Sequence, residues 1–303
     1  MVKRPALFKY HTYSETNMAL HFALPSTIHF DIGQETVPIN AFDAKEEKQN
    51  LGQQPVNIIA SGPSIAEQAI SKLQSTPTIF VNGSLSLTAD YDFKSVVGYV
   101  ISDARFIHHR PEVLQRYYKG QSLYATVAVF EAIAATQPEM LWRYRDAMRI
   151  IYLVDRPWGV KSNKASHTKL SSKYQWLSQR KSLADFADNP NFVITDRRTS
   201  TPIGVSLDVS YGFVEASTVA YVATQLAFTR RAGAIHLYGI DLLNSNQPRF
   251  YEDSRDSAPT KLGEVTKVHI VPSFNLLGSV YKEHGVPVIN HSPISKNLFD
   301  TLG

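Results

Sequence analysis

The alternation of strand-like and helix-like segments from Val56 onward is the feature that most constrains the fold of this chain. Short apolar runs typical of buried strands alternate with segments that have apolar residues at helical spacing, which is the pattern of a parallel sheet. We expect strands at Val56–Ala60, Thr78–Asn82, Val97–Ser102, Leu123–Val129, Arg149–Val154, Ala234–Tyr238 and Val286–Asn290. Helices are expected at Ile65–Gln74, Pro111–Tyr118, Glu131–Ala135, Glu215–Arg230 and Thr266–His284.

Two segments fall outside this alternation. Residues 1–52 show weak periodicity, and we interpret them as an N-terminal extension that packs on the main domain or on a partner chain. Residues 157–200 are polar, rich in Lys, Ser and Asn, and are predicted to form a lid or acceptor-binding insertion. Residues 53–303 then form a single α/β domain with a Rossmann-like, mostly parallel sheet flanked by helices.

The composition is that of an ordinary globular protein, with 43% hydrophobic and 19% charged residues in a chain of 303. No apolar run is long enough to span a membrane, and the N-terminus lacks the apolar core of a signal peptide. Zero cysteines exclude disulfides and cysteine-ligated metals. These features predict a cytoplasmic protein.

Positive charge is concentrated in the middle third of the chain, although the net charge is only +4. The basic residues there are Arg143, Arg145, Arg149, Arg156, Lys161, Lys164, Lys169, Lys173, Arg180, Lys181, Arg197 and Arg198. Such a region suits a phosphate-bearing ligand or an anionic membrane surface. The alternative interpretation is a solvated basic loop.

The segment Val56–Ser64 ends its apolar run abruptly in Ser61-Gly62-Pro63-Ser64, just before a predicted helix. A strand, a tight turn and a helix N-terminus together make a corner where backbone N–H groups bind anions. Gly62 permits close approach of a ligand, Pro63 fixes the turn, and Ser64 is expected to cap the helix. A plain turn between a strand and a helix is the alternative.

Four further strands also end in small or polar residues: Asn82-Gly83-Ser84, Ser102-Asp103, Gly239-Ile240-Asp241 and Asn290-His291-Ser292. Because ligands bind at the carboxyl ends of parallel strands, these ends predict one polar cleft. The chain has no G-x-G-x-x-G fingerprint, Walker loop, HExxH motif or carboxylate-rich metal cluster. A site without a metal must stabilise a leaving phosphate with hydroxyls, backbone amides and Arg or Lys.

The motifs SGPS, FVNGS, ISDARFIHHR, EASTVAYVATQLAF, YGIDLL and PRFYED resemble the Kdo transferases of the bacterial lipopolysaccharide core. More distantly, the chain is similar to metal-independent bacterial sialyltransferases that use CMP-sialic acid. The resemblance covers roughly residues 56–130 and 204–293. Both families imply a CMP-activated 2-keto sugar acid as donor, bound by the domain at 53–303, and no cofactor.

The resemblance also implies roles for individual residues. Ser61, Gly62, Pro63 and Ser64 would surround the donor phosphate and ribose, and Asn82 and Asp103 match positions that touch nucleotide and sugar. Ser217 and Thr218 match the helix opening that meets the donor sugar. The other expected donor contacts are Gly83, Ser84, Gly239 and Asp241.

Two departures concern the catalytic groups. Sialyltransferases carry a tyrosine where this chain has Leu243, and Arg249 and Tyr251 are expected to compensate for it at the leaving phosphate. The sialyltransferase base is a histidine, for which His269 is the nearby candidate. Other candidate bases are Asp103, His108, His109 and His291, and Tyr211 and Glu215 are candidates for lining the cleft.

The sequence therefore predicts a cytoplasmic, inverting, metal-independent glycosyltransferase that moves Kdo from CMP-Kdo to a hydroxyl of the lipopolysaccharide inner core. A glycolipid acceptor implies peripheral contact with the inner face of the membrane; a homo-oligomer is compatible with the sequence, and no nucleic acid is expected. One alternative is a sialyltransferase or related nonulosonic-acid transferase that uses CMP-sialic acid. Another is a non-catalytic nucleotide- or glycan-binding protein on the same fold.

Overall fold

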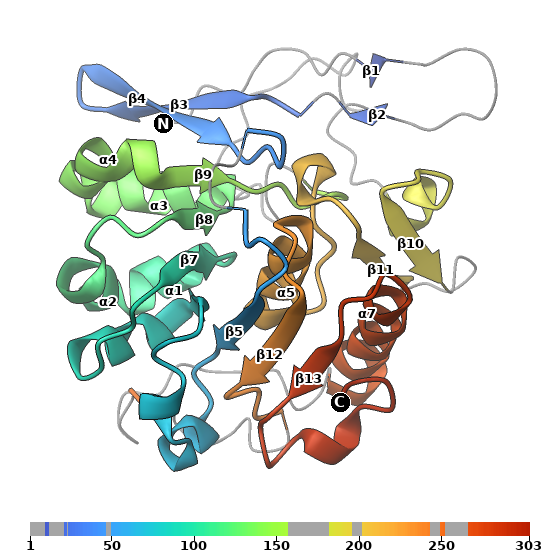
Figure 1. Cartoon of the computed structure of the whole chain (residues 1–303). Coiled ribbons are helices and arrows are strands. Elements are labelled where there is room, and N and C mark those ends of the chain that lie inside the picture. The colour runs from blue at the N-terminus through green and yellow to red at the C-terminus, as the bar shows by residue number, and fades with distance from the viewer. Residues whose placement is uncertain are drawn as a thin grey trace.

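One sheet of nine strands organises the part of the chain that the computed structural model describes, namely residues 10–11, 21–22, 24–46, 50–156, 182–195, 202–242, 249–251 and 266–303 (Figure 1). The strand order is β13 (Val288–Asn290), β12 (Ala234–Tyr238), β5 (Pro55–Ile59), β6 (Thr78–Val81), β7 (Val96–Ile101), β8 (Leu123–Ala125), β9 (Met148–Ile150), β4 (Glu35–Ala41) and β3 (Thr27–Ile32). Every neighbouring pair is parallel except β3 and β4. The predicted α/β fold with a mostly parallel sheet is confirmed.

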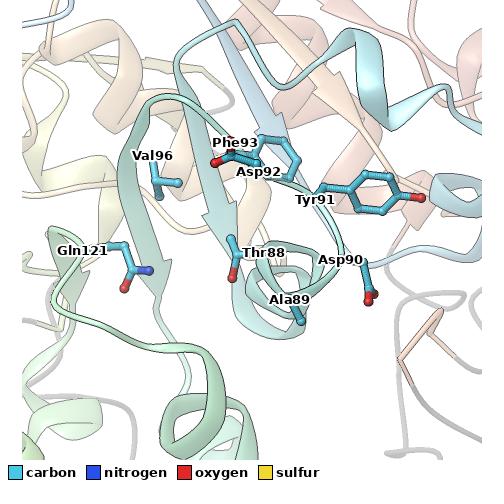
Figure 2. A pocket seen from close by; sticks show the side chains of 8 residues that line it. All are labelled: Thr88, Ala89, Asp90, Tyr91, Asp92, Phe93, Val96 and Gln121. Atoms are coloured by element: carbon cyan, nitrogen blue, oxygen red, sulfur yellow. The ribbon is translucent and has the colours of Figure 1, made fainter.

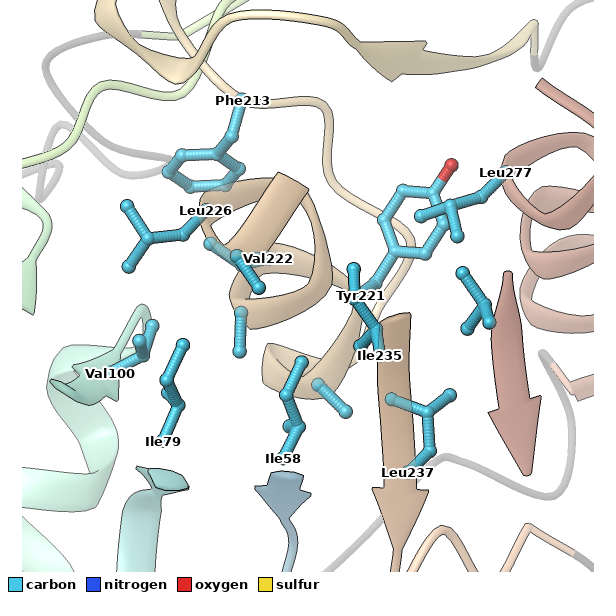
Figure 3. Close-up of a cluster of buried hydrophobic side chains, with 14 of the residues drawn as sticks. Ile58, Ile79, Val100, Phe213, Tyr221, Val222, Leu226, Ile235, Leu237 and Leu277 are labelled. Carbon is cyan, nitrogen blue, oxygen red and sulfur yellow. The ribbon is translucent and has the colours of Figure 1, made fainter. Parts of the chain in front are cut away.

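Successive side chains of the central strands enter two different cores, because strand side chains alternate between the two faces of a sheet. Ile58 belongs to the core under α5 (Val219–Thr229) and α7 (Val271–Glu283), whereas Ile59 belongs to the core on the opposite face. Figure 3 shows the first of these cores, in which Ile58, Ile79 and Val100 of the sheet lie under Val222 and Leu226 of α5. Burying each such side chain contributes about 1.5–3 kcal/mol, so both faces hold the sheet in place.

The opposite face is covered by α1 (Ala104–His109), α2 (Pro111–Tyr117), α3 (Val127–Thr136) and α4 (Pro138–Tyr144). Between β5 and β7 this face also carries the 3₁₀ segments η1 (Pro63–Glu67), η2 (Ile70–Lys72) and η3 (Asn82–Ala89). Smaller strand pairs are β1 (Tyr10–His11) with β2 (His21–Phe22), and β10 (Phe192–Thr195) with β11 (Ile203–Ser206). None of the helices in the described ranges is long and apolar enough to cross a membrane.

The segment interpreted as an N-terminal extension contributes two strands to the main sheet, which the sequence analysis did not predict. β3 and β4 form a hairpin, and β4 pairs in parallel with β9 at Asn40 and Arg149. Ile28, Phe30 and Ile39 are 2% exposed or less and face the core. The alternation of apolar residues is present in the sequence, at Ile28 and Phe30 and again at Val37 and Ile39, but Pro38 in β4 weakens a strand prediction because proline lacks the N–H group that a sheet ladder uses.

Two predicted elements differ in kind. Ile65–Gln74 is not one helix but the two short segments η1 and η2, separated by extended backbone at Gln68. Ile65 and Ile70 are both buried, and five residues of an α-helix would turn them roughly 140° apart, so the break lets both face the core. The predicted strand Leu123–Val129 ends at Ala125, because Val127 and Val129 are buried in the first turns of α3 instead.

Other predicted elements were right in kind but wrong in extent. The helix expected to begin at Glu215 begins at Val219, and the strand expected at Arg149–Val154 is the shorter β9. The helix expected over Thr266–His284 is present as a π-helix, Thr266–Ile270, followed by α7. Most of the predicted insertion at 157–200 lies outside the described residues, which include only η6 (Leu183–Phe186) and β10 within it.

Candidate active site at the switch point of the sheet

The chain reverses its direction across the sheet between β5 and β12. From β5 it adds β6, β7, β8 and β9 on one side, and it then returns to place β12 and β13 on the other side. A crevice at such a switch point, outside the carboxyl ends of the strands, is where open α/β sheets bind ligands. The SGPS corner follows β5 and the Gly239–Asp241 loop follows β12, so both predicted loops lie at this point. Gly62 N–H donates to the Gly239 carbonyl oxygen at 3.0 Å.

Ser64 and Asp241 form a buried hydrogen-bonded pair at the base of the crevice. The Ser64 hydroxyl donates to Asp241 Oδ1, and the Ser64 backbone N–H donates to Oδ2, each at 2.6 Å. Ser64 therefore does not cap a helix, as the sequence analysis expected; the residue before η1 is Gly62, which makes no side-chain cap. A Cβ atom on Gly62 would lie 2.4 Å from Asp241 Oδ2, so only glycine fits beside this pair.

Two serines that follow β13 form hydrogen bonds with the Gly239–Asp241 loop. Ile240 N–H donates to Ser292 Oγ at 2.6 Å, and the Ser295 hydroxyl donates to the Ile240 carbonyl. His291, a candidate base, lies outside this loop: its Nε2 is 2.8 Å from Nδ1 of His236 on β12, and its ring stacks on Tyr238. The structure thus gives the His291 ring an aromatic and imidazole environment, formed by Tyr238 and His236 of β12.

The turn after β6 contains Ser84, which ties two strands together, and Asn82, whose side-chain oxygen is buried without a partner among the described residues. Ser84 Oγ donates to the Ile59 carbonyl at 2.6 Å and accepts Val81 N–H, so it ties β5 to β6. Asn82 has a left-handed φ of 49°, and its side-chain Oδ1 is buried without a hydrogen-bond partner. Because an unpaired buried acceptor is costly, Asn82 Oδ1 is a natural acceptor for a ligand hydroxyl or amino group.

Tyr251 lies directly on this turn. A Cβ atom on Gly83 would come within 1.9 Å of Tyr251 Cε1, so the glycine makes room for the phenol ring. Burial raises the pKa of Tyr99, and the neighbouring Tyr251 raises it further. Phe250 N–H donates to the Ser61 carbonyl at 3.4 Å, which holds the segment of Arg249 to Tyr251 against the SGPS corner. Leu243 lies outside the described residues.

Asp103 ends the loop after β7 and caps α1. Its carboxylate accepts the backbone N–H of Arg105 at 2.9 Å and the Arg105 Nε at 2.7 Å. The pKa of Asp103 is lowered: burial raises it, but the hydrogen bonds and charge of Arg105 outweigh that effect. A carboxylate held in this way is a weak base. His108 and His109 are exposed in the last turn of α1.

The N-terminus of α5 opens onto the same edge of the sheet. The C-terminal end of α5 lies at the edge of the sheet where the parallel strands begin, which we call the amino edge. There the N–H of Leu51, in the segment before β5, donates to the Arg230 carbonyl. Thr218 precedes the helix and its side chain caps none of the first N–H groups of α5, of which that of Tyr221 bonds the Thr218 carbonyl, and an uncapped helix start suits an anion. Tyr221 in the first turn of α5 donates its hydroxyl to the Ser273 carbonyl, so α7 begins beside α5.

Ser217 and His269 meet at this opening. Ser217 has a left-handed φ of 58°, and its Oγ lies 3.3 Å from His269 Nδ1. His269 is half-buried in the π-helix before α7, and such π segments are frequent at functional sites. Burial lowers the pKa of His269 below its ordinary value of 6.5, while the charge of Glu215 raises it less strongly. His269 is thus neutral at physiological pH and competent to accept a proton.

Glu215 connects several charged groups that the sequence analysis left out of the site. It forms an ion pair with Arg156, which also contacts Asp155 at 3.2 Å, and its charge raises the pKa of Arg105. The loops after β7 and β9 therefore meet the segment before α5. Tyr211 is exposed, and two residues before it the Val209 N–H bonds Thr229 Oγ1 at the other end of α5. Arg105 was visible in the motif after Asp103, whereas Arg156 was visible only as one of the basic residues of the middle third, with no signal that pairs it with Glu215.

The hollow in Figure 2 lies elsewhere on the molecule. It is lined by Thr88, Ala89, Asp90, Tyr91, Asp92, Phe93, Val96 and Gln121. Val96 begins β7, so this hollow opens at the amino edge of the sheet, opposite to the predicted site. Within the described ranges, no group of three or more His, Asp or Glu residues is placed to hold a metal ion.

An open, mostly parallel sheet with polar loops at its switch point is the architecture in which α/β enzymes bind their ligands. Residues 42–293 match the family model of the 3-deoxy-D-manno-octulosonic acid transferase WaaZ. The chain belongs to this family and is a Kdo transferase, a glycosyltransferase.

Two curated relatives agree with this assignment. A probable 3-deoxy-manno-octulosonic acid transferase of Salmonella typhimurium is 26% identical over 225 residues, which cover 73% of this chain and 76% of that protein. A probable 3-deoxy-manno-octulosonic acid transferase of Escherichia coli K12 is 23% identical over 264 residues, which cover 85% and 86% of the two chains.

Proposed function

We propose that this enzyme transfers Kdo from CMP-Kdo to a sugar hydroxyl of the lipopolysaccharide inner core, by direct displacement with inversion and without a divalent metal. The matched region spans the whole carboxyl edge of the sheet, from before β5 to beyond β13. The observation that carries the proposal is the meeting of His269 with Ser217 at the open N-terminus of α5. This contact supports a proton acceptor beside the proposed anion site.

The donor is assigned to the crevice between the SGPS corner, the turn after β6 and the start of α5. The N–H groups at the start of α5, which the Thr218 side chain does not cap, suit a carboxylate or phosphate through hydrogen bonds and the helix dipole. Asn82 Oδ1 supplies a buried acceptor that has no hydrogen-bond partner among the described residues. Ser64 and Asp241 already satisfy each other, so we assign them to the shape of the crevice and not to contact with the donor.

The displacement needs a proton acceptor and a stabilised leaving group. The acceptor hydroxyl attacks the anomeric carbon of Kdo, its proton passes to His269, and the bond from that carbon to the phosphate oxygen of CMP breaks. Tyr251 and Arg249 are proposed to stabilise the departing phosphate from beside Gly83 and Ser61. Asp103 is not proposed as the base, because Arg105 holds its carboxylate in the ionised form.

The proposal is tested with a donor panel and purified enzyme. CMP-Kdo and CMP-sialic acid are compared on a lipopolysaccharide core acceptor, and release of CMP is followed with and without EDTA. We expect turnover of CMP-Kdo alone, unchanged by EDTA, and an inverted anomeric configuration in the product by NMR. Preferential use of CMP-sialic acid, or tight CMP binding with no turnover of either donor, refutes the donor assignment.

Contact with the membrane is proposed from the acceptor and from charge. A glycolipid acceptor brings the enzyme to an anionic surface, and the described residues of the basic region identified in the sequence are Arg143, Arg145, Arg149 and Arg156. Cosedimentation with vesicles of phosphatidylglycerol, compared with phosphatidylcholine alone, tests this contact. Equal binding to both compositions contradicts it.

A further inference from the structure

We infer that Ser217 is a positioning residue for His269: its hydroxyl oxygen accepts the proton on Nδ1 and so fixes the tautomer in which Nε2 is free to take a proton from the acceptor. The inference rests on the proposed role of His269 as base. It differs from the role implied by sequence, in which Ser217 contacts the donor sugar.

The geometry that supports this role begins with the backbone. Ala216 is fully buried, Thr218 is extended, and Ser217 between them takes the left-handed conformation that disfavours residues other than glycine, asparagine and aspartate. Strained residues of this kind persist where the surrounding structure holds them, and they cluster at active sites. Here the strained turn presents the Ser217 hydroxyl toward the π-helix Thr266–Ile270, where His269 Nδ1 lies 3.3 Å away.

The chemistry of the imidazole sets which way this hydrogen bond must run. A neutral histidine has one protonated nitrogen and one acceptor nitrogen. Burial keeps His269 neutral, so it acts as a base at Nε2 only when Nδ1 carries the proton. That proton needs an acceptor, and Ser217 Oγ is the hydrogen-bond partner that the structure shows for the ring. Without it the other tautomer is populated, and Nε2 becomes a donor that cannot accept a proton.

The test uses substitutions that separate the hydroxyl from the backbone strain. Ser217→Gly removes the acceptor and relieves the left-handed strain, whereas Ser217→Asn tolerates that backbone and restores an acceptor oxygen. Arg231→Gly is the matched control, because exposed Arg231 also has a left-handed φ, of 63°, but lies at the far end of α5.

We expect Ser217→Gly to lower kcat on the order of 10- to 100-fold with the KM for CMP-Kdo nearly unchanged, since a misplaced catalytic group costs about this much. Thermal stability should not fall, Ser217→Asn should recover much of kcat, and Arg231→Gly should match the wild type. In a His269→Ala background, Ser217→Gly should have no further effect, because the group that it positions is gone.

The inference is wrong if Ser217→Gly lowers kcat equally in the wild type and in the His269→Ala background. It is also wrong if Ser217→Gly raises the KM for the donor and leaves kcat unchanged; Ser217 then contacts the donor instead. His269→Ala with wild-type kcat is a different failure: it removes the proposed base itself, and the positioning role falls with it. The two failures are therefore told apart by the His269→Ala single variant.

Discussion

Replacing Asp241 by alanine tests whether the Ser64–Asp241 pair shapes the crevice or binds the donor. Asp241 is 7% exposed and Ser64 only 1%, so neither partner regains water when the other is removed. Asp241→Ala loses two hydrogen bonds of 2.6 Å to a carboxylate and leaves a buried N–H and a buried hydroxyl unpaired. Each unpaired group costs about 1–3 kcal/mol, so we expect a loss of roughly 3–5 kcal/mol in the free energy of unfolding.

Ser64→Ala supplies the matched comparison. It removes only the hydroxyl bond and leaves the backbone N–H bond to Asp241 intact, so the expected loss is smaller, about 1–2 kcal/mol. Urea denaturation of the two single variants and the double variant gives the coupling energy of the pair, which should be about 0.5–3 kcal/mol for residues in contact. Because Ser64→Ala is a mild change, it stays measurable if Asp241→Ala fails to fold.

The result that refutes this reasoning is an Asp241→Ala variant within about 1 kcal/mol of the wild type in unfolding free energy. If that stable variant also loses binding of CMP, then Asp241 contacts the nucleotide directly, as the resemblance to related transferases implied. If it is destabilised as expected but the folded fraction binds CMP with wild-type affinity, the pair holds the loops after β5 and β12 together.

Three further substitutions test other parts of the structure. Gly83→Ala should displace the ring of Tyr251, whose Cε1 is 1.9 Å from the added Cβ, and lower kcat more than stability, as measured by CMP release and thermal denaturation. Glu215→Gln removes a negative charge that raises the pKa of His269, so the pKa of His269 should fall further below 6.5. The acid limb of the kcat/KM profile should then move to lower pH, and a shift to higher pH contradicts this prediction. Gly233→Ala puts a Cβ 1.9 Å from a backbone oxygen of the segment before β5 and should lower the melting temperature with no specific loss of donor affinity.

The central strands could be predicted because they are buried on both faces and read as apolar runs bounded by turn residues. β5, β6, β7 and β12 were placed within about one residue of their observed bounds for this reason. β3 and β4 were missed although their buried side chains alternate in the sequence, as Ile28 with Phe30 and Val37 with Ile39 show; Pro38 in β4 argues against a strand. The break of Ile65–Gln74 into two short segments depends on tertiary contacts, namely the bond of Ser64 to Asp241 and the burial of Ile70.

The candidate site, like the fold, could be predicted from the sequence only in part. Residues at the ends of buried strands could be located from sequence, since parallel strands bring their carboxyl ends to one edge. Their roles could not, because a sequence does not show partners: Asp241 satisfies Ser64, His291 lies on Tyr238, and Asp103 is held by Arg105. The roles of Asn82, Ser217 and Tyr251 stay predictions until the variants are measured.

Backbone conformation offers an independent way to separate structural from functional turns here. In the described residues, the non-glycine positions with positive φ are Gln53, Asn82, Ser217 and Arg231. Gln53 and Arg231 lie at the amino edge and bond each other, Gln53 N–H to the Arg231 carbonyl at 2.8 Å, so their conformations are explained by packing alone. Asn82 and Ser217 lie at the carboxyl edge, where Asn82 keeps an unpartnered oxygen and Ser217 holds a histidine. The left-handed residues whose conformations packing does not explain, Asn82 and Ser217, thus lie where the donor is proposed to bind. Backbone strain of this kind is expected at a site that is completed by its substrate.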